Sequence, residues 1–175
     1  MMLYHLRHKA ILVLAMLALT ACTVSLLPDY NEELHKGLND ANEKAQTLFS
    51  ALETGATPQN FAKVEKQYHE TIGQFSALLA QAKTRPQPNV SDTLERRLKQ
   101  IPTIQKACAT LSQEDGDPPC LGVVTPRALS EIVETLTAMR DGHKAKGLGS
   151  GTLEFLIGDY ALSIEQALTV ETALQ

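Results

Sequence analysis

The sequence predicts an all-α fold, an antiparallel bundle of four to five helices that follows a cleaved N-terminal signal segment. Three observations favour this class. Apolar residues recur every three or four positions along most of the chain, stretches rich in proline and glycine divide these runs, and no stretch shows the alternation and β-branched enrichment of a strand. Amphipathic helices bury their apolar faces against one another, and short connections favour antiparallel neighbours.

The first two predicted helices form a hairpin. Asp29 followed by Glu32 is typical of a capping box, and Gly55 ends the first helix. Thr57 and Pro58 predict the N-cap and the first position of the second helix. The expected buried stripes are Tyr30, Leu34, Leu38, Ala41, Ala45, Leu48, Phe49 and Leu52 in the first helix, and Phe61, Val64, Tyr68, Ile72, Phe75, Leu78, Leu79 and Ala82 in the second.

The third predicted helix is interrupted. It begins near Val90, after a proline-rich break, and its apolar pattern runs to Leu111. Pro102 lies inside this pattern and removes a backbone hydrogen bond, so we expect the helix to be kinked or divided there. A turn-rich acidic loop over residues 112–122 should follow.

The fourth and fifth helices complete the bundle. Thr125 and Pro126 predict the start of the fourth helix, whose apolar stripe extends to Met139. Residues 141–151 are rich in glycine and predict a flexible connector. The fifth helix is expected over residues 152–173.

The first 21 residues predict an export signal. Arg7 and Lys9 give the segment a positive start without an acidic residue, and residues 10–19 form an apolar run. A helix needs about 20 apolar residues to span a bilayer, so we expect this segment to be removed. The predicted division is a signal peptide over residues 1–21, a tether over residues 22–28 and one helical domain over residues 29–175.

The end of this segment, Leu19-Thr20-Ala21-Cys22, resembles the lipobox of bacterial lipoproteins. The resemblance covers only the first 22 residues. It implies that Cys22 Sγ receives a diacylglyceryl group, that cleavage occurs before Cys22 and that the new amine is acylated. Two or more acyl chains give stable anchoring, so the lipid on Cys22 would hold the protein at the membrane. By family habit, Thr23 at the next position favours the outer membrane, with the protein facing the periplasm.

Charge and cysteine content limit the partners. Removal of residues 1–21 lowers the 16 basic residues to 14, against 20 acidic ones. This acidic balance argues against nucleic acid, whose recognition needs a basic footprint. With Cys22 lipidated, Cys108 and Cys120 are an even pair in a compartment where disulfides persist, and a bridge closing about 13 residues would contribute roughly 3 kcal/mol. Two free thiols are the alternative.

No catalytic constellation, metal site or cofactor is predicted. Glu32 and His35 form an ExxH step, but the sequence around His69 and His143 offers no second step of the kind that a di-iron bundle needs. We therefore expect the three histidines to be exposed. The segment Gly149-Ser150-Gly151 has no preceding strand to build a nucleophile elbow, and a flexible hinge is expected there.

The fifth helix is the candidate functional element. No basic residue follows Lys146, whereas this helix carries four acidic ones. A broad apolar face should pack on the bundle, and Phe155, Leu162 and Ala173 fall on a second, narrower stripe. Apolar residues on two faces indicate either a central, doubly buried helix, which we favour, or a contact surface for another protein.

These observations favour a non-enzymatic lipoprotein of the cell envelope that acts by binding another envelope protein. The alternative is a ligand-binding or sensory bundle for a small apolar or anionic molecule, held between helices near the glycine-rich connector. An enzyme comes third, because it would need catalytic groups brought together in space from His69, His143, Ser150 or the acidic residues.

Overall fold

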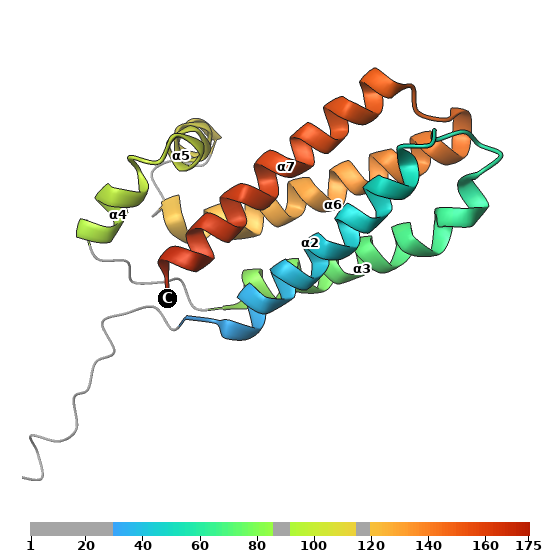
Figure 1. Ribbon diagram of the computed structural model, residues 1–175. Coiled ribbons are helices and arrows are strands. Elements are labelled where there is room, and N and C mark those ends of the chain that lie inside the picture. The colour runs from blue at the N-terminus through green and yellow to red at the C-terminus, as the bar shows by residue number, and fades with distance from the viewer. Residues whose placement is uncertain (1–29, 86–91, 115–119) are drawn as a thin grey trace, which may run out of the picture.

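The computed structural model describes residues 30–85, 92–114 and 120–175. Within these residues there are six helices and no strand. Four long helices, α2 (Glu32–Leu52), α3 (Phe61–Thr84), α6 (Cys120–Lys146) and α7 (Ser150–Ala173), pack as a bundle, and the shorter α4 (Asp92–Leu98) and α5 (Pro102–Glu114) lie beside one end of it (Figure 1). The predicted all-α class is confirmed.

The four long helices form a closed ring. Helix α2 packs on α3 and α7, and helix α6 packs on the same two helices. Successive long helices run in opposite directions, so α2 begins and α7 ends at the same end of the bundle, here called the proximal end (Figure 1). The α2–α3 and α6–α7 turns lie at the opposite, distal end. The length of α2, 21 residues, separates the two ends by about 32 Å.

Helix α2 follows the predicted apolar pattern, except that Tyr30 precedes the helix and is only partly buried. Asn31 is its N-cap, and Asn31 Oδ1 accepts a hydrogen bond from Leu34 N at 2.9 Å. The capping box predicted from Asp29 and Glu32 was wrong, because Asn31 caps the helix and Glu32 is its first residue. Asp29 itself lies outside the described residues. The buried side chains of α2 are Leu34, Leu38, Ala41, Ala45, Leu48, Phe49 and Leu52.

The start of helix α3 differs from the prediction. Asn60, and not Thr57, directly precedes the helix. The Thr57 N–H donates to Asn60 Oδ1 at 3.1 Å, and Asn60 Nδ2 donates to the Gly55 carbonyl oxygen at 2.6 Å. One asparagine side chain therefore closes the whole turn, and Pro58 lies within that turn rather than in the helix. The apolar stripe from Phe61 to Ala82 is buried or partly buried, as predicted.

Pro102 divides the third predicted helix, as expected. Helix α4 ends at Leu98, and Pro102 is the first residue of α5, where its missing N–H removes no helical hydrogen bond. Leu98, Ile104 and Cys108 contribute to a second, smaller core cluster, which also includes residues at the start of α6 and the end of α7.

Helix α6 begins earlier than predicted. The predicted bounds of the loop, residues 112 and 122, were both wrong, because α5 continues to Glu114 and α6 begins at Cys120. Pro126 consequently lies inside α6 and not at its start. Burial of Leu121 and Val124 in the second core cluster stabilises the helical turns before Pro126, despite the hydrogen bond that the proline cannot make.

The connector between α6 and α7 is a short turn. It comprises residues 147–149, so the flexible connector and hinge predicted over residues 141–151 were wrong. Gly147 has a φ of 81°, and a Cβ at this position would lie 2.7 Å from the Ala56 carbonyl oxygen. The Leu148 N–H donates to that same oxygen at 2.8 Å, which joins the two distal turns to each other.

Candidate functional site

Helix α7 is packed on one side and open on the other in its distal half. Tyr160 is fully buried, and its hydroxyl donates to Asn42 Oδ1 at 2.9 Å. Phe155 is 71% exposed and is the one large apolar side chain among the described residues that stands out into solvent. The central, doubly buried position that we favoured from the sequence is therefore wrong for this half of α7.

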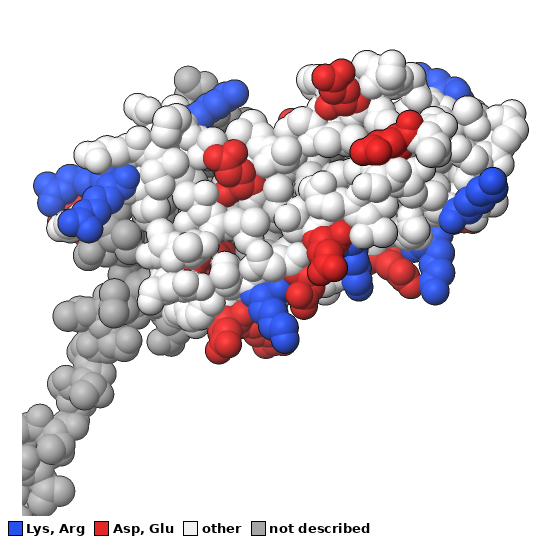
Figure 2. Space-filling model, viewed as in Figure 1, with Lys and Arg blue, Asp and Glu red and all other residues white. Residues whose placement is uncertain are grey.

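Phe155 belongs to a line of residues, here called the α7 stripe, that consists of Gly151, Phe155, Gly158 and Leu162. Their spacing of four, three and four positions places them on one side of the helix. A shallow surface hollow of about 450 Å³ is lined by these four residues together with Glu154 and Asp159. Leu162 is half-buried at the edge of the hollow. Figure 2 shows acidic side chains separated by uncharged surface over this half of α7.

The same side of α7 is covered in its proximal half. Helix α5 packs on α7, and Ala173 is partly buried against the second core cluster. Leu98 and Ile101, from α4 and the residues that follow it, line a groove together with Thr169 and Ala173 of α7. Ala173, expected on the partner surface, thus lies in the packed half, whereas Phe155 and Leu162 lie in the distal half.

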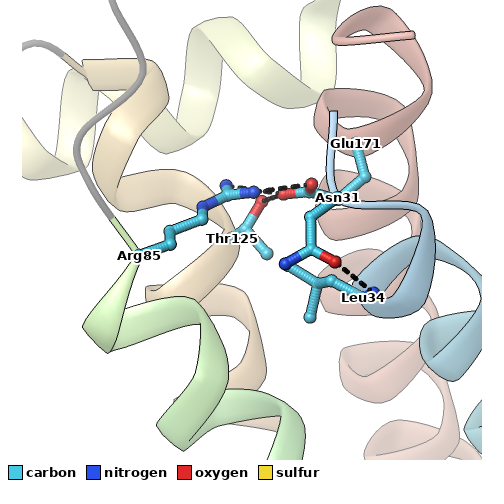
Figure 3. A network of polar contacts seen from close by, with 5 residues as sticks. All are labelled: Asn31, Leu34, Arg85, Thr125 and Glu171. Carbon is cyan, nitrogen blue, oxygen red and sulfur yellow. Dashed lines mark hydrogen bonds and ion pairs between the residues drawn. The ribbon is translucent and has the colours of Figure 1, made fainter. Parts of the chain in front are cut away.

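A buried ion pair joins three helices at the proximal end. Arg85 donates from Nη1 and Nη2 to the two carboxylate oxygens of Glu171, each at 2.7 Å, and Thr125 Oγ1 donates to Glu171 Oε1 at 2.7 Å (Figure 3). The Glu171 side chain is fully buried, and that of Arg85 is 11% exposed. Buried charges require a partner and hydrogen bonds. The network therefore fixes the end of α3, the start of α6 and the end of α7 relative to one another.

Sequence reasoning missed this network. It counted Glu171 within the acidic charge of the fifth helix and assigned Thr125 to a helix cap. One local signal was present, because the residue before a proline is driven to extended backbone, and Arg85 has φ −69° and ψ 147°. This conformation ends α3, but nothing in the sequence relates Arg85 to a residue 86 positions away.

His143 is fully buried at the distal end, so its predicted exposure was wrong. Nε2 lies 2.9 Å from the Thr57 carbonyl oxygen and 2.8 Å from Asn60 Oδ1. Since both partners are acceptors, Nε2 carries the proton. The Tyr68 hydroxyl lies 3.4 Å from Nδ1, and burial raises the pKa of Tyr68, which keeps this phenol protonated. His143 thereby attaches the α2–α3 turn to α6.

A half-enclosed cavity of about 260 Å³ lies beside His143. Its walls come from the end of α2, the first turns of α3 and His143, and it is lined by Ala51, Leu52, Thr54, Asn60, Lys63, Val64, Gln67 and His143. Gln67 Oε1 is buried without a hydrogen-bond partner among the described residues. The cavity has the size and the polar lining to hold a small molecule or water.

His69 and His35 differ in exposure. His69 is exposed, as predicted. His35 is partly buried, so its predicted exposure was wrong. The Tyr30 hydroxyl lies 3.1 Å from its Nδ1, and Thr172 Oγ1 lies 3.4 Å from its Nε2. In the three described segments, no three histidine, cysteine, aspartate or glutamate side chains come together in a way that could hold a metal ion.

Of the three cysteines, only Cys108 has a side chain that the structure describes. Cys108 is buried on α5, and its sulfur is not a free thiol. The Cys120 side chain lies outside the described part of the chain, so the Cys108–Cys120 disulfide stays a prediction. Cys22 and the signal segment also lie outside it. None of the described helices combines the length and the apolar character needed to cross a membrane.

Comparisons with known proteins found no match: no family model, no curated protein and no solved structure is similar to this chain. The candidate site is therefore defined by its geometry and chemistry.

Proposed function

We propose that this protein is a lipid-anchored, non-catalytic interaction module of the bacterial cell envelope, and that it binds another envelope protein through the α7 stripe. The observation that carries the proposal is the 71% exposure of Phe155 on a helix whose opposite side is packed. Aromatic side chains, phenylalanine among them, are enriched at the cores of protein interfaces relative to the rest of the surface. The glycines on either side leave the ring accessible to a partner.

The position of the tether supports this function. The described chain begins at Tyr30, at the proximal end, a few residues after Cys22. A lipid on Cys22 would hold the proximal end close to the bilayer, in the inner leaflet of the outer membrane if Thr23 directs sorting. The exposed half of α7 lies towards the distal end (Figure 1), where a protein in the periplasm can reach it.

The anchor is tested by mass spectrometry of protein purified from its native host. We expect the mature chain to start at Cys22 and to carry a diacylglyceryl thioether and an acylated amine. The Cys22→Ser variant should retain the signal segment and carry no lipid. An unmodified sulfur at Cys22, or a different start site, would contradict the anchor and would leave the α7 surface untouched.

The partner surface is tested by photocrosslinking in native-host cells. A photoreactive residue in place of Ala161, which is exposed next to the α7 stripe, should form an adduct with an envelope protein. The further change Phe155→Ser should lower the adduct yield at least about tenfold, because an interface anchor is lost. The free energy of unfolding should change by less than about 0.5 kcal/mol, because Phe155 is exposed.

The matched control places the photoreactive residue at Ala77, an exposed position on α3, where we expect no adduct with the same protein. An adduct yield that Phe155→Ser leaves unchanged would argue against this surface. So would a destabilisation of several kcal/mol, since it would assign Phe155 to the core.

A second candidate function is the binding of a small molecule in the distal cavity. The unpartnered Gln67 Oε1 and the adjacent Lys63 favour an anionic molecule that also carries a hydrogen-bond donor. Glycolate is a suitable probe, because a ligand that binds only the folded state raises the melting temperature by mass action. This function ranks second because His143 and Asn60 already satisfy each other within the protein.

A further inference from the structure

We propose that the partner presents an amphipathic helix with basic residues on its flank, and that this helix crosses α7 directly over Gly158. The inference rests on the proposed function, since it specifies what the α7 stripe binds. Three features of the described residues carry it: a glycine that the fold does not require, the shape of the hollow around that glycine, and the charge beside it.

The fold itself gives no reason for glycine at position 158. Glycine in a helix interior is less stable than alanine. Gly158 does not have a positive φ, and a Cβ there would meet nothing within 4 Å. By contrast, a Cβ at Gly37 would lie 2.6 Å from Leu78 Cδ2, and one at Gly142 would lie 2.8 Å from Leu148 Cδ2, so packing explains those two glycines. Gly73 on α3 is equally open, so Gly158 is distinguished by its place between Phe155 and Leu162, where glycine allows close approach of another chain.

The two apolar side chains of the hollow are spaced so that one crossing helix could contact both. Phe155 and Leu162 stand on either side of Gly158 and are separated by seven positions, or about 10 Å along the helix axis. This spacing matches the diameter of an α-helix with its side chains, about 10–12 Å. A helix that crosses α7 with its axis over Gly158 could therefore contact both apolar side chains.

The proximal half of α7 already binds helices in this manner. In Figure 1, α7 lies across the view while α5 is seen nearly along its own axis, so α5 crosses α7 steeply. The α4–α5 segment covers the proximal half of this side, up to the neighbourhood of Leu162. A partner helix would extend the same packing into the uncovered distal half.

Charge selects the kind of helix. Glu154 and Asp159 line the hollow, and no basic residue follows Lys146 in the chain. Lys106 and Arg127 line a neighbouring pocket together with Asp159 and Leu162, and Asp159 also accepts a hydrogen bond from Thr135 Oγ1 at 3.0 Å. Glu154 lines the hollow but not this second pocket. Complementary charge therefore calls for lysine or arginine on the partner's flank. Two copies that met through their α7 stripes would instead place acidic residues against acidic residues.

The test uses the full chain in native-host cells, with the photoreactive residue at Ala161. Gly158→Leu should reduce the adduct yield at least about tenfold, because the side chain fills the space of the partner helix. The melting temperature of the purified variant should stay equal or rise, since position 158 is open and glycine is a poor helix residue. The matched control is Gly73→Leu, at an equally open glycine on α3, which should leave the adduct yield unchanged.

The chemistry of the partner is read from the captured peptide. We expect apolar residues at intervals of three and four, with lysine or arginine beside them, and we expect Glu154→Lys to lower the yield severalfold. A captured second copy, a peptide without this pattern, or a lower melting temperature for Gly158→Leu would overturn the inference. If Phe155→Ser abolishes the adduct and Gly158→Leu does not, the proposed function stands and this inference fails. The absence of any adduct rejects both.

Discussion

Replacement of Arg85 by alanine is expected to lower the free energy of unfolding by about 3–5 kcal/mol, the range for removal of one partner from a buried ion pair. The Glu171 carboxylate is fully buried, and both of its oxygens accept hydrogen bonds from the Arg85 guanidinium at 2.7 Å. After the substitution, the charge would stay buried with the Thr125 hydroxyl as its remaining described partner. Urea unfolding followed by circular dichroism measures the change.

Two further variants separate charge from packing. The double variant Arg85→Met, Glu171→Leu should recover most of the lost stability, because it removes both charges and keeps apolar volume. Thr125→Val should cost about 1.5–3 kcal/mol, the contribution of a hydrogen bond to a charged group. If Arg85→Ala cost less than about 1 kcal/mol, the pair would behave as an exposed salt bridge, and the network would not be what holds the proximal end together.

His143→Ala is expected to destabilise the fold by about 2–5 kcal/mol, the range for large-to-small substitutions at fully buried positions. The change opens space beside the existing cavity and removes the contacts of Nε2 with the Thr57 carbonyl oxygen and Asn60 Oδ1. It therefore separates the α2–α3 turn from α6. Thermal and urea unfolding both report the loss.

The chain supplies its own control for this substitution. His69→Ala removes an exposed histidine from α3 and should change stability by less than about 0.5 kcal/mol. His143→Gln should recover part of the loss, because its amide can donate to the same two acceptors. Equal effects of His143→Ala and His69→Ala would mean that the buried contacts of His143 contribute nothing to the fold.

Local pattern was sufficient for the apolar faces of the helices, though not for where the helices begin. The seven residues buried on α2 all belong to the stripe expected from their spacing, because the position of a residue on a helix face depends only on the helical period. Pro102 divided its helix for a reason that is equally local, the missing N–H. The same period placed Phe155 and Leu162 on one side of the last helix. That part of the candidate site was therefore predictable.

Local pattern failed where distant segments meet. Thr125-Pro126 reads as the start of a helix, but α6 begins at Cys120 because Leu121 and Val124 are buried in the second core cluster. The glycine-rich connector reads as flexible, yet Leu148 N–H donates to the Ala56 carbonyl oxygen and holds it. Ala173 shares a side of α7 with Phe155 and is nevertheless packed.

The sequence by itself determined the helical class, the apolar face of each long helix and the break at Pro102, because these features depend on neighbours within one or two turns. Only the tertiary structure decided that His143 and Glu171 are buried and hydrogen-bonded, and that α4 and α5 cover one half of α7 and leave Phe155 in the other half exposed. The physical reason is that contacts across the bundle determine which side chains are buried. Arg85 and Glu171, for example, are 86 positions apart, and the spacing of residues along the chain does not encode such a contact.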